Sequence, residues 1–251
     1  MTRPTGPTGV EGEVDALLQA AEVRTAAGAA TSHARRDSLD LQENEIKDAV
    51  LRMGALVEAA IRRAARSLVD HDADLALDVI KADARINDAQ REVSRLISVT
   101  IATQQPVARD LRYLLTLDHV TYELERIGDH AASVSKQVIK LAPEPPLAEY
   151  VKLPEMAERD AQLVHQVLRA LVDADAVAAR EAAALDDEID GLYHATFDEV
   201  VDLMRQDPAN VERGTRIIIA SHYLERIGDR STNIAEDIVY LVTGDVEDLN
   251  P

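Results

Sequence analysis

The chain has 251 residues, which is enough for one large domain or two domains of ordinary size. It contains no Cys, no Trp, one Phe, ten Gly and nine Pro, a composition that favours an all-helical protein and excludes disulfides and thiolate metal sites. The formal net charge of −19 disfavours nucleic acid and anionic lipid as partners and favours multivalent cations or a basic protein surface, although the same charge would also keep a helical bundle soluble.

Residues 1–36 are rich in Thr, Pro, Gly and Ala and show no sustained periodicity. We expect a mostly disordered tail here, with a short helix around residues 14–27 as the exception. The tail has neither the basic start nor the apolar core of a signal peptide, and the chain has no run of 18 apolar residues that would predict a transmembrane helix. These features predict a protein without membrane insertion, and the absence of Cys suits a reducing cytosol.

A helical pattern begins at about Leu39. The acidic segment 70–72 offers a turn and an N-cap between the first and second helices, and Pro106 is placed to start a third. Three prolines then end the pattern: Pro143, Pro145 and Pro146. Residues 37–142 are therefore predicted to form a first three-helix unit.

The second half of the chain repeats this scheme. Pro154 opens a helix, the acidic segment 173–175 offers a turn like the earlier one, and the Asp-Pro pair at 207–208 supplies an N-cap and a helix start. Gly244 lies just after the last periodic residue, where a C-terminal Gly is common. Residues 152–244 are predicted to form the second three-helix unit.

The two units look like an internal duplication. The pentapeptide Glu-Arg-Ile-Gly-Asp occupies residues 125–129 and recurs unchanged at 225–229. The third helix of the second unit has apolar residues at alternating spacings of three and four, which predicts a heptad seam between long helices packed at shallow angles. We predict an all-α fold of two pseudo-symmetric, elongated three-helix bundles. The first two helices of the units also align with each other, at an offset of 103 residues: Met53 with Met156, Asp83 with Asp186, and Ile86 with Ile189.

Each copy of the pentapeptide places a Glu and an Asp on one face of its helix, because residues four apart lie one turn from each other. Leu124, Ile127 and their counterparts in the second copy are seam residues, so the acids fall at flanking positions that face outward. The second helix of each unit adds oxygen-bearing side chains at matching places. If neighbouring helices are antiparallel, each unit gathers four such side chains: Asp83, Asn87, Glu125 and Asp129 in the first, and Asp186, Asp190, Glu225 and Asp229 in the second.

Acids held this close repel each other, by about 4 kcal/mol for two unit charges about 4 Å apart at an effective dielectric constant near 20. A bound cation would remove that cost, and oxygen ligands without Cys fit Mg, Mn, Fe or Ca rather than a tetrahedral zinc site. The plainer interpretation is a solvated helix face on which Arg126 and Arg226 satisfy the acids; the duplication favours the metal site. Gly128 and Gly228 each cost about 1 kcal/mol relative to Ala inside a helix, so they predict a close approach between helices.

The runs at 124–131 and 224–230, with Asn233 close behind, resemble the signature of the PhoU family. The segment 185–193, with the sequence LDDEIDGLY, is similar to the second-repeat motif of the same family. The resemblance covers roughly residues 37–244, in both repeats and in order. PhoU proteins are accessory regulators of phosphate-specific transport in bacteria.

The resemblance implies two three-helix bundles related by pseudo-symmetry, in a cytoplasmic protein that represses the phosphate-starvation response when phosphate is ample. It implies contacts with the ATPase subunit of the phosphate ABC transporter and with a phosphate-sensing histidine kinase. It also implies multinuclear metal sites built from the acids named above. Asn87 stands where the family pattern has a second Asp, so the second repeat is the stronger metal candidate. We also expect a homodimer, an assembly that no residue pattern here specifies.

Two other functions are compatible with the pattern. A di-iron carboxylate enzyme of the ferritin-like kind needs Glu-x-x-His ligands facing the bundle interior, whereas His222 precedes Glu225 and has no counterpart in the first repeat. A purely structural helical scaffold would need no cluster at all. Because the chain shows no Gly-rich phosphate loop, nucleophile elbow or catalytic triad, we predict that it is not an enzyme. His130 and His222 are interpreted as ordinary surface or boundary residues.

Overall fold

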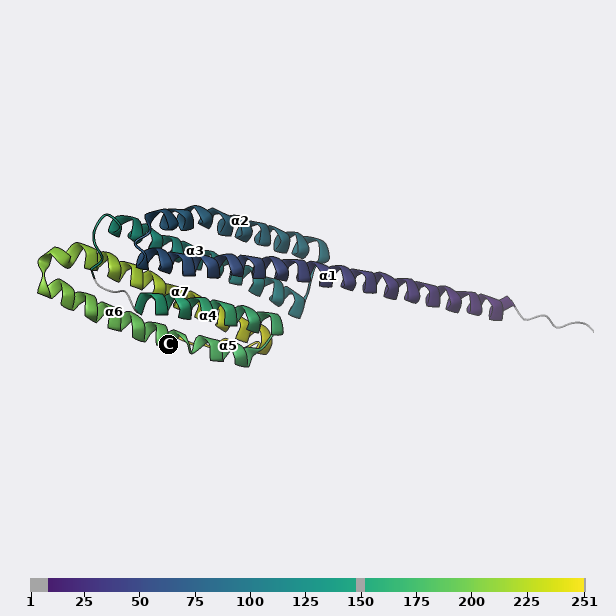
Figure 1. The fold of residues 1–251 in the computed structure, drawn as a ribbon. Coiled ribbons are helices and arrows are strands. Elements are labelled where there is room, and N and C mark those ends of the chain that lie inside the picture. Colours follow the sequence, from purple (N-terminus) through teal and green to yellow (C-terminus); the bar gives the residue numbers. More distant parts are fainter. Residues whose placement is uncertain (1–8, 148–151, 251) are drawn as a thin grey trace, which may run out of the picture. The chain divides into compact units, whose positions relative to one another are not determined.

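The computed structural model describes residues 9–147 and 152–250, with side chains from Arg35 onward (Figure 1). The described residues contain no strand, so the all-α prediction is confirmed. The helices are α1 (Gly9–Val69), α2 (Ala73–Gln104), α3 (Ala108–Leu141), α4 (Lys152–Asp173), α5 (Ala176–Ala183), α6 (Asp186–Gln206) and α7 (Val211–Thr243), with a 3₁₀ turn at Pro208–Asn210.

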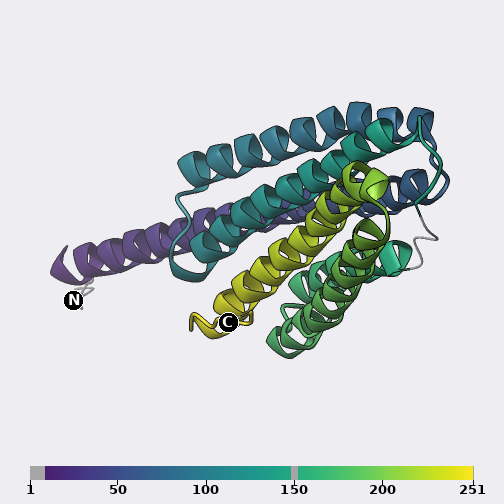
Figure 2. The ribbon, with the colours of Figure 1, turned by 90° about the vertical axis from the view of Figure 1, so that its left-hand side faces the viewer.

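The helices that carry the two predicted repeats lie in one compact unit, Glu45–Pro251, and the residues before it form another unit. Within Glu45–Pro251 the first repeat consists of the later part of α1 with α2 and α3, and the second consists of α4 to α7. Helices α3 and α7, teal and yellow in Figure 2, pack along each other. This pairing of third helices gives the two repeats the pseudo-symmetric arrangement that the duplication predicts.

The structure has a helix at residues 9–36, where the sequence predicted a mostly disordered tail. Residues 9–36 are the first part of α1, whereas residues 1–8 lie outside the described residues. The short helix expected at 14–27 falls within this longer one. The backbone can continue as a helix because no Pro occurs between Pro7 and Pro106, and the stretch is rich in Ala, the strongest helix former.

Acidic caps end and begin the helices where the sequence predicts turns. Asp72 accepts a hydrogen bond from the Leu75 amide at 2.9 Å at the start of α2, and Asp175 caps α5 in the same way. Gly244 ends α7 in the left-handed region, with φ of 85°. Helix α3 begins at Ala108, two residues later than the start expected at Pro106.

The predicted heptad seam forms the core of the molecule. Along α7 the seam residues from Ile217 to Ile238 are all buried, and Leu241 is partly buried. The equivalent stripe of α3, from Leu117 to Val138, is also buried and faces the same core. None of the helices described here is long and apolar enough to cross a membrane. Burying these aliphatic stripes is the main favourable term in the stability of the unit.

The second helix predicted for the second repeat is divided into two helices, α5 and α6. The prediction of three helices in this repeat did not include the division. Residues 184 and 185 form a turn between α5 and α6, so Asp186 is the first residue of α6 rather than an interior one. Asp186, Asp187 and Glu188 then place three acids in the first turn of α6, where the helix dipole favours negative charge. The break therefore fixes where the first acid of the second cluster stands.

Polar contacts join the two repeats along α3 and α7. The Arg230 guanidinium lies 3.4 Å from the Glu123 carboxylate, which is 2% exposed, and His119 pairs with Asp237. The His130 ring stacks on Tyr223, with ring centroids 5.8 Å apart. Because these residues alternate with seam positions, the contacts flank the apolar interface rather than interrupt it.

Two carboxylate clusters

The second cluster is built where α6 passes close to α7. Asp186 and Asp190 come from α6, and Glu225 and Asp229 come from α7. The side chains are near enough that the charges of Asp190, Asp229 and Glu225 each raise the pKa of Asp186. Helix α6 can approach this closely because residue 228 is Gly: a Cβ atom there would overlap Asp186 Oδ1. The close helix approach predicted from Gly228 is confirmed.

Asp186 is buried, with 4% of its surface exposed, which corrects the expectation that it faces outward. Its Oδ2 atom accepts hydrogen bonds from Thr232 Oγ1 at 3.3 Å and from Asn250 Nδ2 at 2.9 Å. Its Oδ1 atom lies against Gly228 and has no hydrogen-bond partner. The burial follows from its place at the first residue of α6, directly beside α7. Asp190, Glu225 and Asp229 are half-buried.

A fifth carboxylate, Asp160 on α4, adjoins this cluster and is absent from the sequence-based site. It is 0% exposed, and neither of its oxygens has a hydrogen-bond partner. Burial raises its pKa well above the usual range, and the charges of Asp186 and Glu225 raise it further. The duplication hid this residue, because the position equivalent to Asp160 in the first repeat is Val57. The available signal was an acid within the apolar stripe of α4, between Met156 and Val164.

Burial and mutual repulsion raise the pKa values of three acids in the second cluster. Burial, followed by the charges of Asp190 and Asp229, raises the pKa of Asp186 from 3.8 to about 7. The pKa of Asp190 and that of Glu225 are also raised, in each case by burial first and the Asp229 charge second. Burial is thus the first cause of each shift, and repulsion between the acids adds to it.

Two basic side chains of α7 contact the acids of this helix. Arg226 Nε lies 3.4 Å from Asp229, and His222 Nδ1 lies 3.1 Å from Glu225. The sequence-based interpretation of His222 as an ordinary boundary residue missed this pairing. His130 behaves as a partly buried residue: burial, followed by the charges of Arg226 and Arg230, lowers its pKa to about 4.

The first cluster repeats the arrangement with less charge. Asp83 and Asn87 lie on α2, Glu125 and Asp129 lie on α3, and all four are half-buried. Asn87 Nδ2 donates a hydrogen bond to Asp83 Oδ2 at 3.2 Å. The pKa of Asp83 is raised, first by burial and then by the Asp129 charge. A Cβ atom at Gly128 would stand 2.9 Å from Ile86 Cδ1, so the helices approach closely here too.

The structure thus brings the predicted side chains together within each repeat and leaves the two clusters separate. In the described residues, no three side chains of His, Cys, Asp or Glu are arranged around a common point as ligands of one ion. Several buried oxygens nevertheless lack partners, in particular those of Asp160 in the second cluster and one oxygen of Asp83 in the first. Burying such oxygens without a partner is costly, and carboxylate oxygens are ligands that hard cations take.

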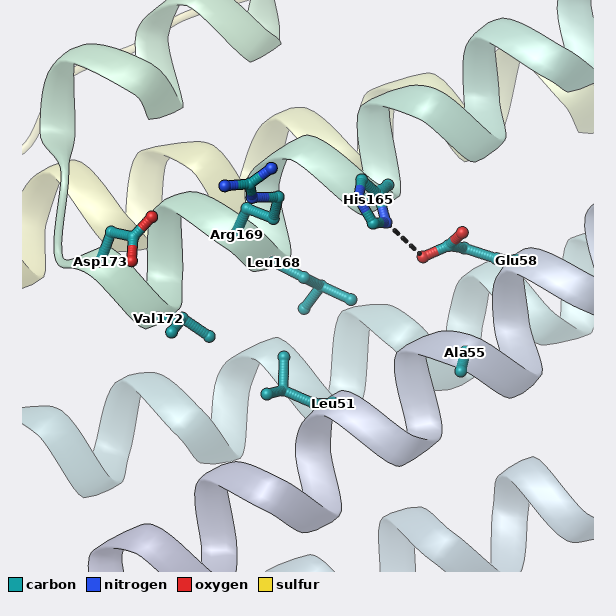
Figure 3. Close-up of a pocket in the computed structure, with 8 residues that line it drawn as sticks. All are labelled: Leu51, Ala55, Glu58, His165, Leu168, Arg169, Val172 and Asp173. Carbon is teal, nitrogen blue, oxygen red and sulfur yellow. Dashed lines mark hydrogen bonds and ion pairs between the residues drawn. The ribbon is translucent and has the colours of Figure 1, made fainter.

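A separate pocket of about 410 Å³ lies between α1 and α4 (Figure 3). His165 Nδ1 on one side is 3.3 Å from Glu58 Oε1 on the other. Arg169 and Asp173 complete a rim with both charge signs, so the pocket presents no net positive field to an anion such as phosphate. Its apolar lining consists of Leu51, Ala55, Leu168 and Val172.

Comparison with known proteins identifies the family. The model of the PhoU domain matches residues 50–138 and 153–238, one match in each repeat. A phosphate-specific transport system accessory protein PhoU homolog from Clostridium acetobutylicum is 35% identical over 207 residues, covering 82% of this chain and 94% of that protein. A homolog of the same name from Pseudomonas aeruginosa is 33% identical and covers 85% of this chain and 88% of its own length.

Solved structures agree. The crystal structure of PhoU from Pseudomonas aeruginosa aligns with a TM-score of 0.78 at 34% identity, over 82% of this chain and 99% of that one. The structure of the phosphate transport system regulatory protein PhoU from Streptococcus pneumoniae aligns with a TM-score of 0.77 at 31% identity, over 84% of this chain and 99% of that one. With both repeats matched and both carboxylate clusters in place, the chain belongs to the PhoU family.

Proposed function

We propose that this protein is an accessory protein of the phosphate-specific transport system that represses the phosphate-starvation response. In this proposal it acts by contact, with the ATPase subunit of the phosphate ABC transporter and with a phosphate-sensing histidine kinase. The observation that carries the proposal is the match of both repeats to relatives whose names describe phosphate transport accessory proteins. The strongly acidic surface suits basic patches on protein partners.

The family relatives are named as accessory proteins, which supports a role other than catalysis. A ferritin-like di-iron enzyme fits less well, because His222 is exposed and precedes its Glu instead of following it by three residues. A purely structural scaffold also fits less well. A scaffold would be more stable with an apolar residue in place of the buried, unpartnered carboxylate of Asp160.

We infer that both carboxylate clusters bind hard cations, of the class Mg, Mn, Fe or Ca. The donor set consists of carboxylate oxygens with one amide, which is the chemistry that these ions prefer. In the second cluster the residues that would hold a cation are Asp186, Asp190, Glu225 and Asp229, with Asp160 behind them. In the first cluster they are Asp83, Asn87, Glu125 and Asp129.

Burial first, and repulsion between the acids second, raise the pKa values of Asp186 and Asp83, and a bound cation would offset the repulsion. Each cluster spans two helices. Binding would therefore hold α6 against α7 in the second repeat and α2 against α3 in the first. A partner protein could then recognise the stiffened surface and its reduced negative charge together. The homodimer stays a prediction, which sedimentation of the purified protein would check.

The partner contacts are tested by co-purification from phosphate-replete cells. We expect the transporter ATPase subunit and a histidine kinase to be recovered with the tagged protein. A variant with charge reversal of exposed acids away from both clusters serves as a control for non-specific electrostatic capture. Recovery of neither partner, with the protein itself intact and abundant, would contradict the adaptor role.

Metal binding is tested by equilibrium dialysis against Mn²⁺ with elemental analysis. Replacing Glu225 by Gln and Asp229 by Asn is expected to remove the ions held by the second cluster and leave the others. The matched pair Glu125→Gln and Asp129→Asn is expected to remove the ions of the first cluster. We expect the second cluster to bind more tightly, because it holds five carboxylates where the first holds three. A stoichiometry that neither pair changes would refute the site assignment.

A further inference from the structure

The residues after α7 turn back and cover the second cluster. Gly244 ends the helix with a left-handed backbone, which redirects the chain. The following residues 245–250, here called the strap, are then held at three points. Glu247 accepts a hydrogen bond from Arg180 Nε at 2.8 Å, and the Leu249 amide donates to Glu236 Oε1 at 2.8 Å. The third point is Asn250.

Asn250 joins acids from two different helices. Its Nδ2 atom donates to Asp186 Oδ2 on α6 at 2.9 Å and lies 3.3 Å from Asp229 Oδ1 on α7. Both acceptors belong to the cluster that we propose as a cation site. The amide therefore stands between the same two helices that a cation would bridge.

The amide is a weak substitute for a cation. It is neutral, so it supplies two hydrogen-bond donors without cancelling the charge of any carboxylate. The oxygens of Asp160 still have no partner beneath it, and the pKa of Glu225 is still raised. A divalent ion would supply two positive charges where the amide supplies none, and it therefore competes for this place.

The first cluster lacks an equivalent cover in the part of the chain that the structure describes. There the amide that contacts the acid is Asn87, which lies on the same helix as Asp83 and cannot leave it. The chain that follows α3 runs elsewhere: Pro145 accepts a hydrogen bond from Arg213 on α7 at 3.0 Å. The two clusters thus differ in whether their amide can be displaced.

We propose that the strap is an intramolecular competitor of cation binding at the second cluster. For a hard divalent cation to bind between Asp186 and Asp229, Asn250 must withdraw, and its withdrawal loosens Leu249 and Glu247. Cation binding then changes the surface around α5 and the end of α7, where the strap is anchored. This proposal rests on the proposed cation binding of the cluster and names how it is regulated.

The test measures Mn²⁺ binding by titration calorimetry at pH 7 in protein whose first cluster is silenced by Asp83→Asn and Glu125→Gln. In this background, Asn250→Ala is expected to bind Mn²⁺ about tenfold more tightly, a factor equivalent to one hydrogen bond to a charged group. The control is Val246→Ala, since Val246 belongs to the strap and is 87% exposed. It is expected to bind as the background protein does. Any affinity tag is placed before residue 1.

Strap release has its own readout. On adding Mn²⁺, hydrogen exchange at the Leu249 amide is expected to speed up, because its bond to Glu236 is lost, while exchange in the core of α7 does not. Unchanged affinity in Asn250→Ala, or weaker binding because its amide oxygen is a ligand, overturns the strap proposal and leaves cation binding standing. Absence of Mn²⁺ binding in every variant overturns the cation function itself, and the strap proposal with it.

Discussion

Replacing Asp186 by Asn is expected to stabilise the protein, by an amount that grows as the pH rises from 4 to 7. Burial and neighbouring acids raise the pKa of Asp186 from 3.8 to about 7 in the folded protein. Between these values the folded state holds a proton that the unfolded state has released, so rising pH favours unfolding. The neutral Asn escapes this loss, which reaches about 4 kcal/mol at pH 7 at 1.36 kcal/mol per pKa unit.

The measurement is urea unfolding at several pH values, with a chelator present, of the parent protein and the variant. The difference between the two is the quantity to follow, because other groups titrate in this range. His130 contributes with the opposite sign, since a pKa lowered to about 4 makes the folded state gain stability as the pH rises toward 6.5. That contribution is common to both proteins and cancels.

Asp187→Asn is the matched control, because Asp187 adjoins Asp186 in the chain and is exposed. Its effect is expected to be small and to vary little with pH. A difference between parent and Asp186→Asn that is the same at pH 4 and pH 7 would show that the buried acid is not strained by its surroundings. Adding Mn²⁺ at pH 7 should narrow the difference, because a ligand at one hundred times its Kd stabilises the parent by about 2.7 kcal/mol.

Gly228→Ala is expected to destabilise the protein by about 2 kcal/mol. A Cβ atom at this position overlaps Asp186 Oδ1, and Asp186 is a short, buried side chain with little freedom to move away. Helix α6 would have to shift, and overpacking of this kind costs about 1–3 kcal/mol. Ala has a higher helix propensity than Gly, which recovers about 1 kcal/mol. With an overpacking cost of about 3 kcal/mol, the net destabilisation is about 2 kcal/mol.

Two other glycines serve as controls for the effect of Gly228→Ala on stability. Gly191 in α6 has no atom within 4 Å of the place where a Cβ would stand, so Gly191→Ala is expected to stabilise by about 1 kcal/mol. At Gly128 the added Cβ would stand 2.9 Å from Cδ1 and 3.2 Å from Cγ2 of Ile86, a milder overlap than at Gly228, so Gly128→Ala is expected to fall between the two. Urea unfolding at pH 7 ranks them. Equal stabilisation by the Gly191 and Gly228 substitutions would mean that α6 and α7 do not approach closely.

The main helices and the positions of most cluster acids could be predicted from the sequence, because the same pattern occurs in both repeats. The identical segments 125–129 and 225–229 locate the third helices, and the heptad spacing assigns their acids to positions beside the seam. With neighbouring helices taken as antiparallel, the matching acids of the second helix are then expected to lie close to them, which predicts that Glu225 lies near Asp186. The same reasoning predicts the contact at Gly228, which the structure confirms.

The features that occur in only one of the two repeats could not be predicted from the duplication. Asp160 has no acidic counterpart, and its importance comes from burial among residues of α4, α6 and α7. The strap has no periodic pattern, and its bonds join residues far apart in the chain, such as Asn250 and Asp186. The turn at 184–185 likewise interrupts a pattern that continues unbroken in α2. These features depend on tertiary contacts rather than on local spacing.

The pairing of α3 with α7 has a consequence for how the clusters respond to each other. Asp129 in the first cluster is followed by His130, which stacks on Tyr223 of α7. Asp229 in the second cluster is followed by Arg230, which reaches Glu123 of α3. Each contact therefore joins a residue next to the acid pair of one cluster to the third helix of the other repeat. We therefore predict that cation binding at one proposed cluster alters the affinity of the other, which calorimetric titration of the protein with and without the Glu125→Gln and Asp129→Asn pair would check.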